Sequence, residues 1–428
     1  MQHSSFLGDI LTTLFERRRS TTKSDDRRAI SEMCDALLSA EGEISGLKLA
    51  AAILARYRQL EQDEKLEFFC YLNDALEFEP QTIVDLALVY QKDGSPAAFS
   101  ALSKASEPRR QELLRRLNQP PGATAELVAM RKDLIDLLPG NEDLKRTDLD
   151  FVHLLRSWFN RGFLVLRQIS WDTSATILEK IVAYEAVHAI DDWEDLRRRL
   201  YPPDRRCFAF FHPTMPDEPL IFVEVALTGT IPGSIGDLLT DERTHLAAED
   251  TTTAVFYSIS NCQRGLHGVS FGNLLIKQVV SELKQQLPQL DNFVTLSPIP
   301  GFSRWLGTLG DNARATAILA GEASPAELEE MAAFYLLQAK RADGLPVDPV
   351  ARFHLGNGAV VHNLHAGGDT TPKGLKQSGG VMVNYLYDQS LTERNHENFV
   401  TDKQVAASKA VKNMALSDKN SATGDLTK

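Results

Sequence analysis

Apolar residues between positions 28 and 158 recur at steps of three and four, the spacing of one face of an α-helix, as in Leu47, Ala51 and Leu54. Proline and glycine interrupt this pattern at residues 80, 94–96, 120–122 and 139–140, where one helix is expected to end and another to begin. Residues 1–158 are therefore predicted to form an all-helical bundle domain.

Beyond Gly162 the pattern changes to short runs rich in β-branched and aromatic residues, which are typical of strands. Helices are predicted at 272–287 and 325–341, the second beginning with Ser324 as N-cap and Glu327 as the acid of a capping box. Residues 159–428 are therefore predicted to form a mixed α/β domain. Its strands are predicted at residues 163–169, 207–212, 220–227, 254–259, 293–296, 359–365 and 381–387.

Three polar stretches of the second domain are predicted to lie at its surface. Residues 241–253 are acidic and residues 367–376 are rich in glycine, threonine and lysine, so both are expected to be loops. From about residue 401 the chain lacks aromatic residues, and we expect a polar tail with a short exposed helix at 406–414.

Length, composition and charge restrict the class of protein. A chain of 428 residues exceeds what one hydrophobic core usually organises, so two domains are expected. The hydrophobic fraction of 43% and the charged fraction of 24% are those of an ordinary globular protein. The formal net charge of -12 argues against nucleic acid as a partner, so an anionic ligand would need a local binding site.

Cysteine, hydropathy and histidine patterns indicate a cytoplasmic protein without a metal. Four scattered cysteines form no CxxC pair, which fits a reducing compartment. No apolar run reaches the roughly 18 residues of a membrane span, so no membrane partner is expected. The ten histidines show no HExxH or similar spacing that would indicate zinc.

A strand, a glycine-containing turn and a helix follow one another between residues 254 and 287, an order suited to phosphate binding. Gly265, Gly268 and Gly272 would let backbone N–H groups approach a pyrophosphate, and Arg264 and Lys277 would add positive charge. The spacing matches neither the dinucleotide fingerprint nor the P-loop. A tight turn that only needs small residues therefore stays open as an alternative.

Two further residues are candidates for acid–base or positioning chemistry. Ser297 follows a predicted strand, and Pro298 and Pro300 restrict the backbone after it, so its hydroxyl could be aimed into a cleft. His354 lies between an apolar run and a glycine turn, where an imidazole could act as an acid or base. The alternatives are that Ser297 caps the following turn and that His354 is a hydrogen-bonded structural residue.

Taken together, these features resemble the malonyl-CoA decarboxylase family, from the helical first part to about Tyr387. The resemblance implies an N-terminal all-helical bundle domain with a role in oligomerisation, followed by an acetyltransferase-like (GNAT-type) mixed α/β catalytic domain, with the boundary near Trp158. The matching blocks are residues 163–171, 217–229, 256–260, 274–277, 296–302, 353–359 and 384–385.

The resemblance also implies a set of site residues. The catalytic serine falls on Ser297 and the catalytic histidine on His354, which is expected to come from another strand. Tyr387 matches a tyrosine near the family's active site, although a strand tyrosine is also often structural. The general acetyltransferase signature is only partly met at 265–270, which begins with glycine and ends with serine. The coenzyme A pyrophosphate would lie on His267, Gly268, Val269, Ser270, Phe271, Gly272 and Asn273.

The activity implied by the resemblance is conversion of malonyl-CoA to acetyl-CoA and CO2 through a thioester enolate that is then protonated. Ser297 would orient the malonyl carboxylate, and His354 would help to hold it and supply the proton. The family is usually described with serine as proton acceptor and histidine as donor. Because the thioester is the electron sink, no cofactor is expected besides the coenzyme A of the substrate.

Two other functions stay open at this point. One is an acyltransferase that uses acetyl-CoA, and the other is a non-catalytic acyl-CoA sensor. The family also suggests a homo-oligomer, a dimer or a tetramer, with a role in fatty acid or malonate metabolism.

Overall fold

The structure is a computed structural model that describes residues 27–40, 42–240, 242–269 and 272–421. The chain divides into two units. The helical unit contains the chain through Leu164 and two later segments, His212–Pro216 and Gln263–Ser270. The sheet unit contains Val165–Phe211, Asp217–Cys262 and Phe271–Lys428.

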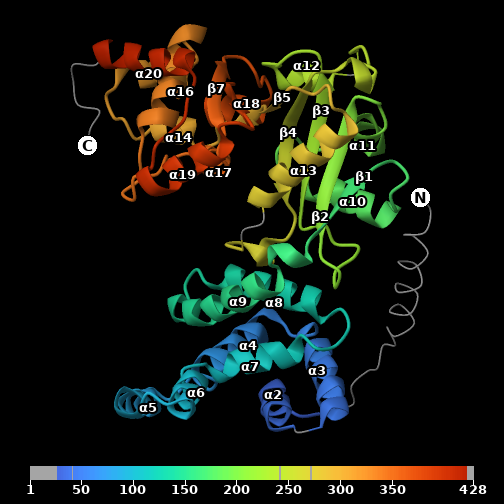
Figure 1. Cartoon of the computed structure of the whole chain (residues 1–428), viewed down its shortest axis with the longest axis vertical. Helices are drawn as coiled ribbons and strands as arrows, with labels where there is room; N and C mark the ends of the chain where they lie inside the picture. The colour runs from blue at the N-terminus through green and yellow to red at the C-terminus, as the bar shows by residue number, and fades with distance from the viewer. Residues whose placement is uncertain (1–26, 41, 241, 270–271, 422–428) are drawn as a thin grey trace. The chain divides into compact units, whose positions relative to one another are not determined.

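The helical unit begins with a run of helices (Figure 1), most of which contribute buried apolar side chains to a core. Phe68, Phe69, Leu113 and Leu155 are among the buried side chains of this core. The all-helical bundle predicted for the first third of the chain is therefore confirmed. Its elements are α2 (Ile30–Ser39), α3 (Glu43–Tyr57), α4 (Gln62–Asp74), α5 (Pro80–Asp93), α6 (Pro96–Ala105), α7 (Arg109–Leu117), α8 (Ala123–Leu137), η1 (Glu142–Leu144), α9 (Lys145–Trp158), η2 (Arg161–Phe163) and, from a later segment, η4 (Arg264–Leu266).

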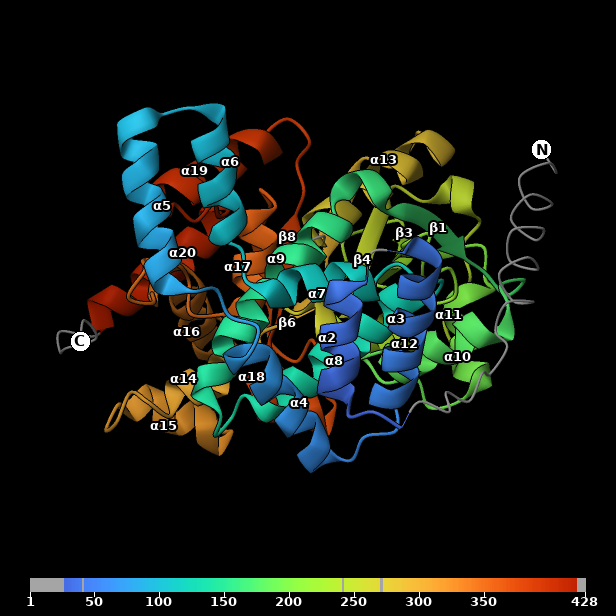
Figure 2. The same ribbon diagram turned by 90° about the horizontal axis from the view of Figure 1, so that it is seen from below.

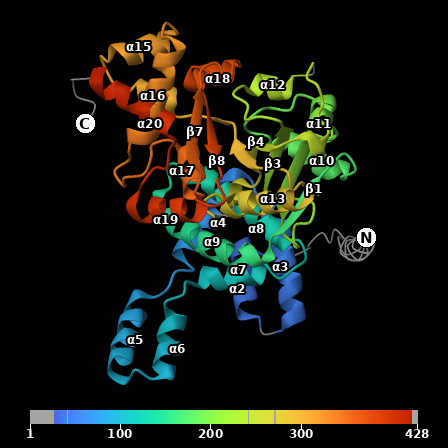
Figure 3. The same cartoon turned by 45° about the horizontal axis from the view of Figure 1, so that its top comes forward.

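Helices α5 and α6 form a hairpin, and they lie side by side in two further views (Figure 2, Figure 3). Gly94 ends α5 in the left-handed conformation, and the Ser95 hydroxyl caps α6 by accepting a hydrogen bond from the Ala98 N–H. Along the described chain, no residue of α5 is buried. The hairpin therefore presents an exposed apolar surface, which consists of Val84, Leu88, Val89, Tyr90 and Phe99.

The sheet unit alternates strands and helices (Figure 1). Its first half contains β1 (Val165–Ile169), α10 (Ala175–Tyr184), α11 (Trp193–Leu200), β2 (Arg205–Phe211), β3 (Ile221–Thr228), α12 (Ile235–Leu239), η3 (Ala248–Asp250), β4 (Thr253–Asn261) and α13 (Gly272–Gln286). Its second half contains β5 (Asn292–Thr295), β6 (Ser297–Pro298), α14 (Phe302–Leu306), α15 (Ala313–Ala320), α16 (Pro325–Gln338), α17 (Pro349–Gly356), β7 (Val360–His365), α18 (Pro372–Ser378), β8 (Met382–Leu386), α19 (Thr392–Asp402) and α20 (Lys409–Ser421).

One mixed sheet joins these strands in the order β1-β2-β3-β4-β5-β8-β6, with β7 also paired to β8. Strands β1 to β4 are antiparallel, β4 and β5 are parallel, and β8 is antiparallel to β5, β6 and β7. Helix α13 makes the crossover that the parallel pair requires. The mixed α/β class predicted for this domain is confirmed, since a mixed sheet with a strand-to-helix crossover is present.

Strands β4 and β5 separate in the middle of the sheet. Their last pair is Phe256 with Thr295, and β4 then continues to Asn261. The register between β3 and β4 shifts at this point, because Glu224 pairs with Ser258 and the next residue of β3 pairs with Phe256. This shift leaves Tyr257 as an extra residue on β4, which is a β-bulge. After the separation, the chain beyond β5 pairs with β8 through β6.

Helices cover the sheet and bury its strands. Helices α10 and α11 pack against β1 and β2 in an apolar cluster that includes Ile169, Ile177, Leu196 and Cys207. Helix α13 contacts β2 and β3. Every residue of β3 except the last is buried, which is the pattern of a strand covered on both faces.

The element predictions for the second domain are largely confirmed. All seven predicted strands are present, and each end lies within two residues of its predicted position. The predicted capping box is also present at α16, where the Ser324 hydroxyl accepts from the Glu327 N–H at 3.3 Å. The Glu327 carboxylate in turn accepts from the Ser324 N–H at 2.9 Å.

Two predictions of surface structure are wrong. Residues 367–376 include the start of helix α18, because Thr371 caps it by accepting from the Gly374 N–H and Pro372 is suited to a first turn. The tail helix α20 is not simply exposed, since it buries Val411 and Ala415 and contacts α16 and β7. These two residues are four positions apart, so they form an apolar face that the polar composition concealed.

The cysteines and the helix lengths bear on the class of protein. All four cysteines are free, and Cys34, Cys207 and Cys262 are buried whereas Cys70 is exposed. Among the described residues, no helix combines the length and the apolar character needed to cross a membrane.

Candidate active site

Ser297 and His354 contact each other in the sheet unit although 57 positions separate them in the chain. The Ser297 Oγ lies 3.3 Å from the His354 Nε2. Both side chains are buried, with exposed fractions of 6% and 3%. The structure therefore brings together the two residues that the sequence marked independently as candidates for acid–base or positioning chemistry.

Ser297 is held by strand pairing on both sides of its position. It lies in the short strand β6 and pairs with Val383 of β8. The Leu296 N–H before it donates to the Phe256 carbonyl of β4 at 3.0 Å. Pro298 follows and restricts the backbone. The serine therefore lies where the segment after β5 stops pairing with β4 and begins to pair with β8.

His354 comes from helix α17, so the expectation that it completes the site from a strand is wrong. Asp348 is the N-cap of this helix, and its carboxylate accepts a hydrogen bond from the Ala351 N–H at 2.9 Å. Pro349 occupies the first turn. The Asp-Pro pair at 348–349 is a helix start signal that the sequence contains, and it accounts for a helix rather than a strand at this position.

A directed chain of hydrogen bonds connects Tyr387, His354, Ser297 and Thr295. The Ser297 hydroxyl donates to the Thr295 Oγ1 at 2.9 Å. A hydroxyl has one proton to donate, so the Ser297 Oγ must accept from the His354 Nε2, which places the imidazole proton on Nε2. The His354 Nδ1 then accepts from the Tyr387 hydroxyl at 2.8 Å. The hydrogen-bond chain thus runs from Tyr387 through the imidazole, whose Nε2–H is directed at the serine, to Thr295.

Burial keeps these groups uncharged. Removal from water lowers the pKa of His354 to about 3, because no charged group nearby compensates the imidazolium. Burial also raises the pKa of Tyr387 well above its ordinary value. Near neutral pH the site therefore contains a neutral imidazole and a neutral phenol.

Three residues around this chain were not identified from the sequence. Thr295 accepts from both Ser297 and the Tyr385 N–H, the second at 3.2 Å. The Tyr385 ring stacks on the His354 imidazole with ring centres 4.5 Å apart. The Asn384 amide donates to the Thr295 carbonyl at 3.0 Å. Strand periodicity could have found two of them, since residues two apart share a face, as Thr295 does with Ser297 and Tyr385 with Tyr387.

The predicted pyrophosphate turn is divided between the two units. His267, Gly268 and Val269 belong to the helical unit, whereas Gly272 and Asn273 begin α13 in the sheet unit. Ser270 and Phe271 lie outside the described residues. Of the two predicted cations, Arg264 pairs with Asp136 of α8 at 2.7 Å, and Lys277 is exposed on α13.

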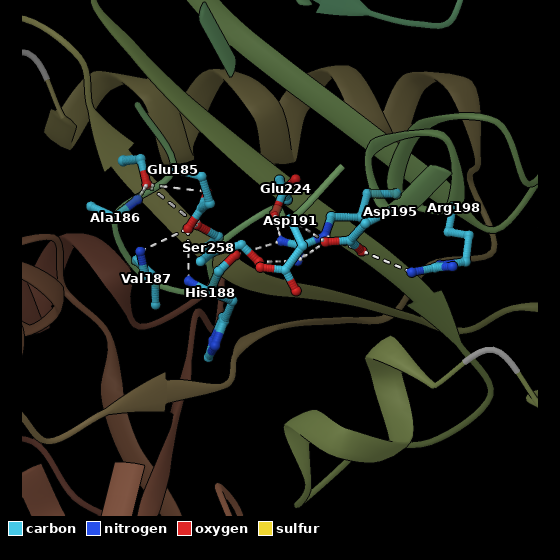
Figure 4. Close-up of polar contacts among 12 residues, drawn as sticks. Glu185, Ala186, Val187, His188, Asp191, Asp195, Arg198, Glu224 and Ser258 are labelled. Carbon is cyan, nitrogen blue, oxygen red and sulfur yellow. Dashed lines mark hydrogen bonds and ion pairs between the residues drawn. The ribbon is translucent and has the colours of Figure 1, made fainter. Parts of the chain in front are cut away.

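A second polar cluster joins residues 185–188 and α11 to β3 and β4 in the sheet unit (Figure 4). Glu185 accepts hydrogen bonds from the Val187 and His188 N–H groups and from the Ser258 hydroxyl of β4. The fully buried Glu224 of β3 accepts from the Arg199 guanidinium at 3.3 Å. Burial raises the pKa of Glu224 to about 8, although Arg199 opposes this shift. The cluster ties residues 185–188 to β4, and no catalytic role follows from its contacts.

Comparison with known proteins finds matches to one protein family over most of the chain. The profile of the malonyl-CoA decarboxylase C-terminal domain matches residues 162–325 and 311–425, and that of the malonyl-CoA decarboxylase N-terminal domain matches residues 77–159. The mitochondrial malonyl-CoA decarboxylase of the goose Anser anser anser is 37% identical over 71% of this chain and 69% of its own length. The mouse protein of the same name is 33% identical over 76% of this chain and 74% of its own.

Solved structures are also similar to this chain. The crystal structure of malonyl-CoA decarboxylase from Rhodopseudomonas palustris has a TM-score of 0.85 and 49% identity, and the match covers 90% of this chain and 98% of that one. The malonyl-CoA decarboxylase from Agrobacterium vitis has a TM-score of 0.86 and 49% identity, with coverage of 90% and 99%.

Proposed function

Because this chain belongs to the malonyl-CoA decarboxylase family, we propose that it converts malonyl-CoA to acetyl-CoA and CO2 with Ser297 and His354 as catalytic residues. The observation that supports this site is the hydrogen-bond chain from Tyr387 through His354 to Ser297. It positions an imidazole N–H beside a serine hydroxyl in a buried place on the sheet, where hydrogen bonds are stronger than in water.

The reaction requires an acid after the carbon–carbon bond breaks. Loss of CO2 leaves the bonding electron pair on the carbon next to the thioester, and the thioester oxygen shares this charge as an enolate. A proton must then reach that carbon. The His354 Nε2–H is the donor, and the Tyr387 hydroxyl at Nδ1 fixes the tautomer that carries it. Donation from the neutral ring leaves an imidazolate, which the Tyr387 hydroxyl stabilises by its hydrogen bond to Nδ1. One proton taken up from solvent then restores Nε2–H and balances the reaction.

Ser297 holds the departing carboxylate in this proposal. Its hydroxyl already directs its proton at Thr295, away from the imidazole, so His354 does not activate it as a nucleophile. A substrate carboxylate can take the place of Thr295 as acceptor. This interaction orients the carboxylate without neutralising it, so the electron pair can leave toward the thioester.

The coenzyme A part of the substrate is assigned to the turn from His267 to Asn273 and to Tyr387, as the family resemblance implies. The first part of this range offers backbone N–H groups, and α13 begins within it at Gly272, so a helix N-terminus is also present. No cofactor is assigned besides the coenzyme A that enters with the substrate, and acetyl-CoA leaves as the product. The alternative of an acyltransferase would use the same coenzyme A contacts.

The compartment and the oligomeric state belong to the proposal as well. The cysteine pattern supports the cytoplasm, whereas the goose and mouse relatives are named mitochondrial. A homo-oligomer is supported by the exposed apolar surface of the α5–α6 hairpin. Light scattering on the purified chain tests this, because Leu88→Glu should lower the measured mass if the hairpin is the interface.

The decisive experiment supplies malonyl-CoA to the purified chain without any amine acceptor. A decarboxylase releases CO2 and acetyl-CoA in equal amounts. An acyltransferase leaves malonyl-CoA intact and consumes acetyl-CoA only when an amine is added. Tight coenzyme A binding without turnover of either substrate would instead identify an acyl-CoA sensor and would overturn the proposal.

A further inference from the structure

A buried arginine of the helical unit holds the turn to which the proposed function assigns coenzyme A. Arg131 of α8 is 2% exposed, and its Nη1 donates to the Gly265 and His267 carbonyls, each at 2.7 Å. Asp148 of α9 fixes the guanidinium from the other side, with the Nε 2.8 Å from the Asp148 Oδ1. All of these residues belong to the helical unit.

Two further contacts fix the same turn. The Arg156 Nη2 donates to the Gly268 carbonyl at 3.1 Å. Gly265 packs against α8 so closely that a Cβ at this position would lie 1.9 Å from the Val128 carbonyl oxygen. Only glycine fits there, so the backbone of the turn packs directly against α8 at this position.

The arginine determines which way the polar groups of the turn point. The C=O and N–H of one trans peptide point in opposite directions, and the described chain has no cis peptide. When Arg131 binds the His267 carbonyl, the Gly268 N–H therefore points away from the guanidinium. No described residue accepts a hydrogen bond from this N–H, whereas the Val269 N–H is used by the Leu266 carbonyl. The Gly268 N–H is thus available to donate a hydrogen bond to a ligand.

We propose that Arg131 is a positioning residue for the coenzyme A end of the substrate. It binds the carbonyl oxygens of the turn, which would repel a pyrophosphate, and thereby leaves the Gly268 N–H directed toward an anionic oxygen. Arg131 does not touch the ligand in this proposal, and it acts through the backbone. The inference rests on the proposed binding of coenzyme A at this turn.

The test compares two substrates that differ only at the pyrophosphate end. Malonyl-CoA contains the pyrophosphate and the nucleotide, and malonyl-pantetheine lacks both. Arg131→Lys keeps the charge but loses the planar fork that reaches two carbonyls and Asp148 together. We expect KM for malonyl-CoA to rise about tenfold, as for one weakened hydrogen bond to a charged group. The kcat should stay within about twofold, and kcat/KM for malonyl-pantetheine should not change.

Two other variants complete the experiment: a second test variant, in case Arg131→Lys does not fold, and a control. Arg156 is exposed, so Arg156→Gln should fold normally, and it should raise KM for malonyl-CoA alone by about threefold. Lys48→Gln is the matched control, because Lys48 is an exposed lysine on α3 of the same unit and has no part in the contacts described above. It should leave both substrates unaffected.

The outcomes separate this inference from the proposed function. Equal losses on both substrates, or an unchanged KM for malonyl-CoA in both arginine variants, would overturn the positioning role. Binding of coenzyme A itself, measured by calorimetry, gives a second readout that does not depend on turnover. A wild-type protein that binds coenzyme A but does not release CO2 would refute the proposed function, and the Arg131→Lys comparison of affinity would still decide the inference.

Discussion

The Tyr387 hydroxyl lies 2.8 Å from the His354 Nδ1, so the imidazole has a neutral partner on each of its two nitrogens. A histidine between two hydroxyl groups has no carboxylate to stabilise a positive charge, and the pKa of His354 is accordingly low. This differs from a histidine paired with aspartate, which is prepared to accept a proton. The arrangement at His354 favours a neutral ring that donates from Nε2.

Replacement of either catalytic residue should abolish most of the decarboxylation. Ser297→Ala and His354→Ala are each expected to lower kcat for malonyl-CoA by about 100-fold or more, the usual range for a general acid or a charge-orienting donor. Release of CO2 from labelled malonyl-CoA measures this. His153→Ala, at an exposed histidine of α9, is the control and should keep full activity. Near-normal turnover in a folded Ser297 or His354 variant would remove that residue from the mechanism.

The two buried tyrosines at the end of β8 should respond in opposite ways to loss of the hydroxyl. Tyr387→Phe removes the partner of the His354 Nδ1, which should lower the free energy of unfolding by about 1 kcal/mol and reduce kcat. The Tyr385 hydroxyl is buried and has no hydrogen-bond partner among the described residues. Tyr385→Phe should therefore raise the free energy of unfolding by about 1 kcal/mol. Urea unfolding of both variants measures the difference, and the same sign for both would contradict this account.

The sequence was most informative where the local signal agreed with the tertiary fold. The helical period before Trp158 and the alternating runs after it predicted the bundle and all seven strands, and Ser324 with Glu327 marked the start of α16. Ser297 and His354 were found by residue type and flanking residues. Their contact could not be predicted from the local sequence, because it forms only when β6 and α17 pack together, and the two residues are 57 positions apart in the chain. The family resemblance supplied that link.

Other features could not be predicted because they depend on long-range packing. Nothing near Arg131 in the sequence shows that its guanidinium binds carbonyls more than 130 positions away. Long-range packing also makes residues 263–270 part of the helical unit, although they follow β4 of the sheet unit in the sequence. The division of the chain at residue 158 stays a prediction. The strand expectation for His354 is wrong for a local reason, since Asp348 as N-cap and Pro349 in the first turn begin a helix there.

Acid should destabilise the protein through His354. The unfolded chain binds a proton at this residue near pH 6.5, whereas the folded protein does so only near pH 3. Between these values the unfolded state holds more protons, so the free energy of unfolding falls as the pH decreases. From pH 6.5 to pH 5 the loss is about 2 kcal/mol. Denaturant unfolding of the wild type and of His354→Gln measures it, and an equal pH dependence in both would show that His354 does not contribute.

Glu224 should produce a pH dependence of the opposite sign. In the unfolded chain this carboxyl ionises near pH 4.5, whereas in the folded protein burial raises its pKa to about 8 despite Arg199. Between these values the folded state holds more protons, so the stability present below pH 4.5 is lost as the pH rises toward 8. A pKa difference of this size corresponds to a full loss of about 5 kcal/mol, and the opposing effect of the ion pair with Arg199 is already contained in it.

Glu224→Gln tests this effect, because glutamine keeps the size of the side chain and cannot ionise. Between pH 6.5 and pH 8, where His354 is neutral in both states, the variant should unfold with a free energy that changes little, whereas the wild type should lose stability over the same interval. Glu249→Gln, at an exposed glutamate of the same unit, is the control and should follow the wild type. If Glu224→Gln and the wild type show parallel curves, Glu224 is ionised in the folded protein near neutral pH, and the ion pair with Arg199 then outweighs the cost of burial.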